Sequence, residues 1–260
     1  MSSHTPARVV LITGGASGLG LATGHRLAAD GLTIALADLD AGKAQAAAQQ
    51  LPGSGHIGLR CDVADEASVK ASFEVVAARL GEVSVLACFA GILSTAKNPG
   101  RLPTTEISLE EWDRVMQINA RGSFLCIREM LRRAAGEPME HGRIVTVASL
   151  AGQMGGMQSG AAYSASKGAV LALSKVAARE AASLGITVNA ISPGPIDTPM
   201  LHLTVPPGHG DQKYLGTAGV PLGRIGLPEE IAAAVSYLVS PGAAFVTGAT
   251  IDVNGGMLMR

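Results

Sequence analysis

The sequence predicts a doubly wound α/β fold, a three-layer sandwich in which helices cover both faces of a seven-stranded parallel sheet. Three observations support this prediction. Short apolar runs alternate with helical patterns along the whole chain, which is typical of βαβ units. The runs are apolar on both faces, as in Ile144–Ala148, so helices are expected on both sides of the sheet. The composition is 47% hydrophobic but only 3% aromatic, which favours a large core of small aliphatic side chains.

The elements follow one another in a regular order. Seven candidate strands are Arg8–Thr13, Thr33–Asp38, His56–Cys61, Val83–Phe89, Arg143–Ala148, Thr187–Ile191 and Thr250–Val253. The candidate helices between them are Leu19–Asp30, Ala41–Leu51, Glu66–Leu80, Leu109–Ala135, Ala162–Leu184 and Pro228–Leu238. Gly31, Gly81 and Gly185 each follow the last periodic residue of a helix, where a left-handed cap is expected. Such alternation predicts a parallel sheet with right-handed crossovers.

One segment departs from this rhythm. Residues 194–219 show no clean periodicity, and they follow the sixth strand, at the edge of a parallel sheet where ligands bind. We expect this segment to be a substrate-binding lid. The chain shows no repeat or linker, so residues 1–260 are predicted to form a single domain.

Composition also restricts the class of protein. The formal net charge is −1 and the longest basic run is Arg132-Arg133, which argues against nucleic acid or an anionic membrane as a partner. The three cysteines are widely spaced and form no C-x-x-C motif, which favours free thiols in a reducing compartment. The early apolar run Val9–Ile12 is too short for a signal peptide or a membrane span. We therefore expect a soluble cytoplasmic protein, and the spacing of the six histidines suggests no catalytic metal.

A glycine-rich turn, Thr13–Gly20 (TGGASGLG), comes directly after the first strand and opens a helix. Backbone N–H groups and the positive end of a helix dipole bind phosphate at such a turn. Gly14 and Gly18 permit the turn, and Gly20 is expected to let the helix pack on the strand. An ordinary glycine turn is the alternative, but Asp38 ends the next strand eighteen residues after Gly20, where a carboxylate binds a ribose hydroxyl in dinucleotide sites.

Tyr163 and Lys167 lie four residues apart early in a predicted helix, so their side chains share one face. A phenol titrates near pH 10, and a neighbouring ammonium lowers that pKa toward the range useful for proton transfer. An exposed pair on a solvated helix face would have the same spacing. Ser149, after the fifth strand, and Asn119, in a predicted helix, would each be unremarkable alone.

Together, Asn119, Ser149, Tyr163 and Lys167 follow the order and approximate spacing of the four catalytic residues of the short-chain dehydrogenase/reductase family. The chain resembles the short, single-domain branch of that Rossmann-type family, whose glycine spacing is T-G-x-x-x-G-x-G. Further similar segments run almost to the C-terminus: Asp62-Val63, Pro193–Thr198 and Asp252–Gly256.

This resemblance implies a role for each of the four residues. Tyr163 would be the general acid/base, and Lys167 would lower the pKa of that phenol and bind the nicotinamide ribose. Ser149 would hydrogen-bond the substrate oxygen, and Asn119 would hold a water in a proton relay. The expected reaction is hydride transfer between nicotinamide and a secondary alcohol or ketone.

The resemblance also implies a set of cofactor-binding residues. These are Gly14, Ser17, Gly18, Leu19, Gly20, Asp38, Leu39, Asp62, Val63, Ala90, Gly91, Tyr163, Lys167, Pro193, Gly194, Ile196 and Thr198. NADP users in the family usually carry a basic residue at one of two positions, occupied here by Ser17 and Leu39. The Asp38 carboxylate would repel a 2′-phosphate, so NAD is the expected cofactor.

Two features depart from the family pattern. Cys88-Phe89 replaces the usual Asn-Asn of N-N-A-G, and the Ser149–Tyr163 spacing is one residue longer than is typical. Cys88 is expected to be a small buried hydrophobe rather than a nucleophile.

The substrate pocket is expected to be bounded by three segments: Leu93-Ser94, Gln153–Gln158, and the lid residues Met200, Leu201, His202 and Tyr214. Three alternatives stay open: a 3-oxoacyl-carrier-protein reductase, a dehydrogenase of cyclic diols or sugars, and a non-catalytic NAD-sensing protein on the same fold. The family resemblance implies a homotetramer, which the apolar faces of two long helices would suit.

Overall fold

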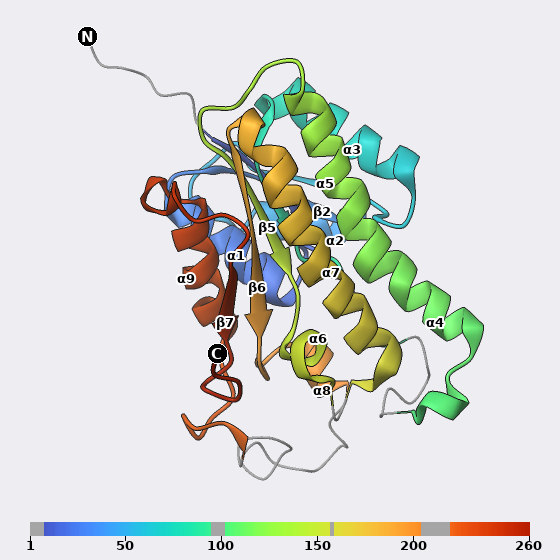
Figure 1. Cartoon of the computed structure of the whole chain (residues 1–260). Helices are drawn as coiled ribbons and strands as arrows, with labels where there is room; N and C mark the ends of the chain where they lie inside the picture. Colours follow the sequence, from blue (N-terminus) through green and yellow to red (C-terminus); the bar gives the residue numbers. More distant parts are fainter. Residues whose placement is uncertain (1–7, 95–101, 157–158, 204–218) are drawn as a thin grey trace.

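The computed structural model describes residues 8–94, 102–156, 159–203 and 219–260, and its strands form one parallel sheet (Figure 1). The seven strands are β1 (Val9–Thr13), β2 (Thr33–Asp38), β3 (Ile57–Arg60), β4 (Val83–Cys88), β5 (Gly142–Val147), β6 (Ile186–Pro193) and β7 (Thr250–Val253). Their order is β3-β2-β1-β4-β5-β6-β7, which confirms the predicted seven-stranded doubly wound sheet. The order reverses direction between β1 and β4, and the crevice at such a reversal is where open α/β sheets bind ligands.

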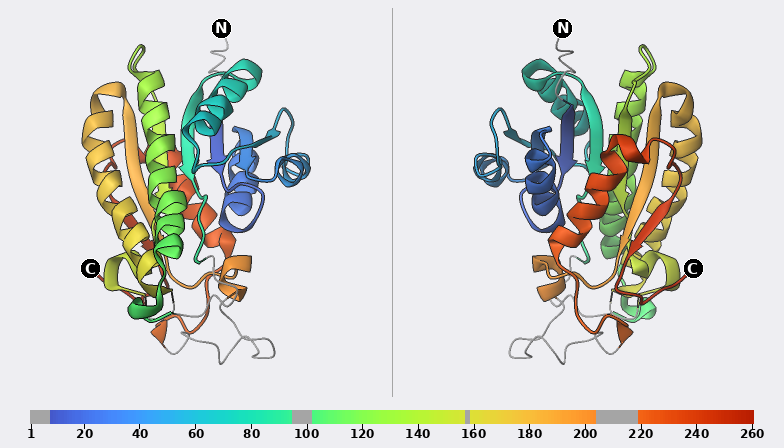
Figure 2. Two further views of the ribbon diagram at one scale, coloured as in Figure 1. Left: turned by 90° about the vertical axis from the view of Figure 1, so that its right-hand side faces the viewer. Right: turned by 90° about the vertical axis from the view of Figure 1, so that its left-hand side faces the viewer.

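Helices cover both faces of this sheet, as Figure 2 shows. The helices are α1 (Gly18–Ala29), α2 (Ala41–Ala48), α3 (Glu66–Leu80), α4 (Leu109–Met116), α5 (Gly122–Ala134), α6 (Leu150–Met154), α7 (Gly160–Ala181), α8 (Pro199–His202) and α9 (Pro228–Val239). Short 3-10 turns occur at Thr104–Glu106, Ala182–Leu184 and Pro241–Ala243. One apolar core packs α1, α2 and α9 against the sheet, and a second core packs α3, α5 and α7 against the other face.

Local sequence explains where several helices begin and end. Asp65 precedes α3 and accepts hydrogen bonds from the backbone N–H groups of Ala67 and Ser68, which satisfies two donors of the first turn. Gly185 has φ +71°, in the left-handed region that ends a helix at little cost for glycine. Gly31, Gly81 and Gly185 all have positive φ, but Gly81, with φ +103° and ψ 175°, ends α3 outside the left-handed helical region, so the left-handed cap expected there is wrong.

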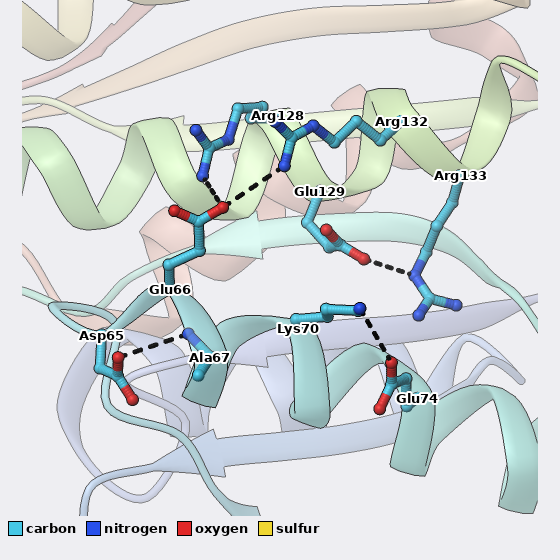
Figure 3. Close-up of polar contacts among 9 residues, drawn as sticks. All are labelled: Asp65, Glu66, Ala67, Lys70, Glu74, Arg128, Glu129, Arg132 and Arg133. Atoms are coloured by element: carbon cyan, nitrogen blue, oxygen red, sulfur yellow. Dashed lines mark hydrogen bonds and ion pairs between the residues drawn. The ribbon is translucent and has the colours of Figure 1, made fainter.

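Ion pairs link the outer surfaces of α3 and α5 (Figure 3). Glu66, at the start of α3, lies 2.5 Å from Arg128 and 3.4 Å from Arg132 on α5. The hydrogen bond from Arg128 lowers the pKa of the Glu66 carboxyl. These side chains are largely solvent-exposed, so they position the helices less than the apolar contacts beneath them do.

The structure refines three predicted segments. The expected helix Leu109–Ala135 is divided by a π-helical turn at Gln117–Arg121. Two helices of five and four residues, α6 and α8, were not predicted because neither is long enough to show helical periodicity. Most of the expected lid, residues 204–218, lies outside the described residues. At its beginning, the hydroxyl oxygen of Thr198 accepts a hydrogen bond from the backbone N–H of Leu201 and so caps α8. Across the described part of the chain, no helix is both long and apolar enough to cross a membrane.

Candidate active site

A cleft of about 770 Å³ follows the carboxyl ends of the central strands, over the point where the strand order reverses. The structure brings every expected cofactor-binding residue to the wall of this cleft, together with Ser149. Of the expected catalytic and cofactor-binding residues, Asn119 is the exception, because it is fully buried and does not line the cleft.

The glycine-rich turn leaves space that any side chain would fill. Gly14 has φ +65°, and a Cβ atom added there would lie 2.7 Å from the backbone nitrogen of Ala90. A Cβ atom on Gly20 would overlap the carbonyl oxygen of Gly14. Gly20 therefore makes room for the turn itself, which corrects the expectation that it serves helix–strand packing.

The first turn of α1 is open to an anion. Ser17 is the residue before α1, and its side chain makes no capping hydrogen bond. The backbone N–H groups of a helix start that lack a side-chain partner, together with the helix dipole, bind phosphate groups. The space at Gly14 and the uncapped start of α1 thus fit a dinucleotide pyrophosphate.

Asp38, at the end of β2, lies beside the glycine-rich turn. One carboxylate oxygen accepts a hydrogen bond from the backbone N–H of Ala16 at 3.1 Å. A shallow hollow beside it is lined by Ala16, Ser17 and residues 38–43. Lys43 is the one cation in that lining, but its ammonium lies 3.6 Å from the Asp40 carboxylate. The carboxylates of Asp38 and Asp40 outweigh the single, already paired ammonium of Lys43, so this hollow disfavours the 2′-phosphate of NADP.

Tyr163 and Lys167 extend from the first two turns of α7 into the cleft. The Lys167 ammonium donates a hydrogen bond to the carbonyl oxygen of Val147 at 2.7 Å, at the end of β5. Its nitrogen lies 5.8 Å from the centre of the Tyr163 ring. Lys167 is only 5% exposed, and burial lowers the pKa of its ammonium to about 8. The expected shared face is therefore confirmed, whereas the alternative of a solvated pair is wrong.

The pKa of Tyr163 departs from the sequence-based expectation. Burial raises the pKa of the phenol above its usual value, and a hydrogen bond with Ser149 offsets part of that rise. The expectation that Lys167 brings this pKa down is not met in the chain alone, because desolvation disfavours both the phenolate and the ammonium.

Ser149 is held at the start of α6, where its hydroxyl oxygen accepts a hydrogen bond from the backbone N–H of Ala151 at 3.1 Å. The hydroxyl therefore keeps its own proton free for donation while its position is fixed by the helix. This geometry, with the hydrogen bond to Tyr163, places a hydroxyl donor and a phenol side by side.

Asn119 connects three segments from the π-helical turn. Its side-chain oxygen accepts a hydrogen bond from the N–H of Ile92 at 2.8 Å. Its side-chain nitrogen donates to the carbonyl of Ile92 at 2.9 Å and to the hydroxyl of Ser166 at 3.0 Å. Because these bonds use both amide hydrogens and one lone pair of the oxygen, the side chain holds the chain after β4 against α7.

The substituted pair after β4 lies close to the cofactor cleft. Phe89 lines the cleft, and its backbone N–H donates to the carbonyl of Thr13 at 3.1 Å. Cys88 is buried and hydrogen-bonds Cys126, and this bond together with burial raises the pKa of the Cys126 thiol. Burial raises the pKa of Cys61 to about 12. Protonated, buried thiols of this kind act as small hydrophobes.

The wall on the substrate side is mostly apolar. Leu93, Met154, Met200 and Leu201 line it as expected. Gln153 points elsewhere, because its amide nitrogen donates to Ser192 and Asp252 at 2.5 Å each.

Other parts of the expected substrate pocket lie away from the cleft or beyond the described residues. Ser94 donates to the carboxylate of Glu111 at 2.5 Å. The ring of His202 lies 2.7 Å from the carboxylate of Asp197, outside the lining. Residues 157 and 158 and Tyr214 lie outside the described residues.

The cleft is also lined by residues that the sequence did not single out, among them Arg114, Ile118, Leu150, Ile225 and Met257. Arg114 could have been found, because it lies one helical turn before Ile118 and five residues before Asn119. Met257 gave no such signal, since nothing in the sequence indicates that the C-terminal segment returns to the cleft. Within the ranges that the structure describes, no three His, Cys, Asp or Glu side chains are grouped to hold a metal.

The doubly wound sheet and the cleft at its reversal point define a Rossmann-type α/β architecture, in which ligands bind at the carboxyl ends of the strands. A family model described as "Enoyl-(Acyl carrier protein) reductase" matches residues 14–258. The chain is 39% identical over 259 residues to D-threitol dehydrogenase of Mycolicibacterium smegmatis, covering 97% of this chain and 94% of that protein. It is also 39% identical over 253 residues to cis-4-hydroxycyclohexanecarboxylate dehydrogenase of Sinomonas cyclohexanicum, covering 96% of each.

Among solved structures, 3-ketoacyl-(acyl-carrier-protein) reductase from Brucella melitensis, complexed with NADH, superposes with a TM-score of 0.85. The two chains are 30% identical, and the match covers 97% of this chain and 98% of that one. The chain belongs to the short-chain dehydrogenase/reductase family. The protein is therefore an oxidoreductase. Two solved structures that are similar to it contain a nicotinamide cofactor, NADPH in one and NADH in the other.

Proposed function

We propose that the protein is an NAD-dependent dehydrogenase that transfers a hydride between nicotinamide and a secondary alcohol or its ketone. The observation that carries this proposal is the convergence of Tyr163, Ser149 and Lys167 in the cleft that begins at the glycine turn. Bound NAD supplies the hydride-accepting carbon, and the protein supplies alignment and proton transfer.

The residues have distinct tasks in this proposal. The Ser149 hydroxyl donates a hydrogen bond to the substrate oxygen, which orients that oxygen beside Tyr163. The Tyr163 phenolate accepts the alcohol proton during oxidation, and the phenol returns it during reduction. The buried Lys167 ammonium favours the phenolate by its charge and binds the nicotinamide ribose. Asn119 keeps Ile92 and Ser166 in place, and a water at its main chain would complete the proton relay.

The NAD-binding surface follows from the residues along the cleft. The pyrophosphate would lie at the glycine turn, and the adenosine would lie beside Asp38, Leu39, Asp62 and Val63. Residues from Pro193 to Thr198 would contact the nicotinamide. We further propose a cytoplasmic homotetramer built of one domain, residues 1–260, with residues 194–219 as a lid.

Asp38→Ala is expected to change cofactor preference. The substitution removes the carboxylate that would bind the adenosine ribose and repel a 2′-phosphate, so kcat/KM for NAD should fall by about 10- to 100-fold. Relative use of NADP should rise. Asp38 also accepts the Ala16 N–H, so Asp38→Asn, which keeps an acceptor, separates ribose binding from support of the turn. Unchanged NAD/NADP preference in both variants would remove Asp38 from this role.

Substrate oxidation at alkaline pH tests the reaction itself. Since burial raises the pKa of Tyr163, the phenolate fraction, and with it NADH formation from a panel of secondary alcohols, should rise by up to about tenfold per pH unit from pH 7 to 9. Ketone reduction needs the protonated phenol, which is present throughout that range, so it should not rise. Parallel pH profiles in both directions would contradict Tyr163 as the proton carrier.

The same panel separates the alternatives. A 3-oxoacyl-carrier-protein reductase would act on 3-oxoacyl thioesters rather than on free ketones, and the similarity to a reductase of that kind favours testing one. A non-catalytic NAD sensor would bind NADH tightly yet turn over nothing. Retention of Tyr163 and Lys167 in the cleft argues against the sensor.

A further inference from the structure

Arg114 lies on α4 at the mouth of the cleft, and its part in the chemistry is so far unassigned. It lines the cleft together with Ile118, one helical turn further along the same face. Ile118 is followed directly by Asn119, the residue that holds the chain after β4 in place. Arg114 is therefore attached to the same rigid helical segment that supports the catalytic residues.

The charges along the cleft are unevenly distributed. Among the described lining residues, the carboxylates are Asp38 and Asp62, both at the end proposed for the adenosine. The cations in that lining are Lys167, which lies beside Tyr163, and Arg114. Arg114 is one helical turn from Glu111, the residue that accepts a hydrogen bond from Ser94 next to Leu93. The substrate end thus has positive charge and, within the described lining, no carboxylate to neutralise it.

The guanidinium of Arg114 has capacity for a further partner. One terminal nitrogen of the guanidinium donates to the side-chain oxygen of Gln117 at 3.2 Å, and among the described residues no carboxylate pairs with it. Glu111, one turn away on α4, accepts a hydrogen bond from Ser94 instead. A guanidinium can form two parallel hydrogen bonds with a carboxylate, a geometry that ammonium cannot reproduce.

We propose that Arg114 binds a carboxylate of the substrate, so that the protein acts on a hydroxy acid or oxo acid. The substrate would place its reacting carbon beside Tyr163 and its carboxylate at Arg114. The apolar side chains between these points, among them Leu93, Ile118 and Met154, suit a hydrocarbon spacer. This inference rests on the proposed dehydrogenase function and specifies its substrate class.

Reduction of matched ketones by NADH tests the proposal. The pair is 6-oxoheptanoate and its methyl ester, which differ in charge but carry the same ketone. The wild-type protein should prefer the acid by at least about tenfold in kcat/KM. Arg114→Gln should lower kcat/KM for the acid by about 10- to 100-fold, mainly through KM, and leave the ester unchanged. Arg114→Lys should retain part of the preference.

Arg79→Gln is the matched control, because Arg79 is an exposed arginine on α3 outside the cleft lining. It should change neither substrate. Equal use of acid and ester by the wild type would overturn the proposal, as would an equal loss of both in Arg114→Gln. The proposal would also be overturned if Arg114→Gln lowered kcat/KM only for a 3-oxoacyl group carried on an acidic carrier protein, since Arg114 would then contact the carrier.

A binding measurement distinguishes failure of this inference from failure of the proposed function. Heptanoate and methyl heptanoate cannot react, so their binding to the protein–NADH complex is measured by calorimetry. If the wild type binds heptanoate and Arg114→Gln does not, the carboxylate site is supported even when no ketone is reduced. Absence of ketone reduction would then contradict only the dehydrogenase assignment. Turnover of the ester without heptanoate binding would leave the dehydrogenase intact and overturn the role of Arg114.

Discussion

Tyr163→Phe should abolish turnover while NADH binding survives. The substitution removes the one phenolic oxygen that the described residues contribute to the cleft lining, and it keeps the ring at the start of α7. Loss of a positioned acid/base costs about 10²- to 10⁴-fold in rate, and the rest of the cleft can only partly compensate through alignment. We expect kcat to fall by about three to four orders of magnitude, measured as NADH oxidation with the best ketone of the panel.

Tyr237→Phe provides the control for this result. Tyr237 lies on α9, is 50% exposed, and is absent from the cleft lining. It should retain wild-type turnover, while both variants should bind NADH with a Kd within about fivefold of the wild type, since a lost neutral hydrogen bond is worth about 1 kcal/mol. Turnover by Tyr163→Phe within tenfold of the wild type would contradict the assignment of the proton carrier.

The sheet was readable from the sequence because its strands are apolar on both faces. Thr33–Asp38 and Thr250–Val253 were predicted residue for residue, and the other strands differ by one or two residues at their ends. What could not be predicted depends on hydrogen bonding rather than on burial. The π-helical turn that contains Asn119 needs a changed backbone hydrogen-bond pattern, which leaves no mark in hydrophobic periodicity.

The candidate site could be located for a related reason. Parallel strands bring their carboxyl ends to one edge, so residues that follow β1, β4, β5 and β6 had to converge there. Orientation and desolvation were not accessible in the same way. Gln153 was expected at the substrate but bonds Ser192 and Asp252. The rise in the pKa of Tyr163 follows from burial, which only the folded chain reveals.

Asn119→Ala is expected to damage both stability and turnover. It removes the acceptor for the N–H of Ile92 and the donor for the Ile92 carbonyl, which leaves part-buried backbone groups without partners. Unfolding free energy should fall by about 2–4 kcal/mol, measured by urea denaturation. Because Gly91 lies directly beside both Asn119 and Lys167, loosening this chain should also lower kcat/KM by about 100-fold, since small misplacements at a reacting centre carry costs of that size.

Ser166→Ala tests whether the bonds from Asn119 to Ile92 carry this effect. It deletes the hydroxyl that accepts from Asn119 and donates to the carbonyl of Tyr163 at 2.7 Å, but leaves both bonds to Ile92 intact, so it should cost only about 1–2 kcal/mol. Hydrogen exchange at the Ile92 amide is the deciding measurement, because a positioning role predicts faster exchange in Asn119→Ala and nearly unchanged exchange in Ser166→Ala. If Asn119→Ala kept wild-type stability and protected the Ile92 amide while losing activity, the asparagine would serve proton transfer rather than the position of the chain after β4. The three hydrogen bonds of its amide group favour the positioning role, in which the π-helical turn and α7 hold the chain after β4 in place.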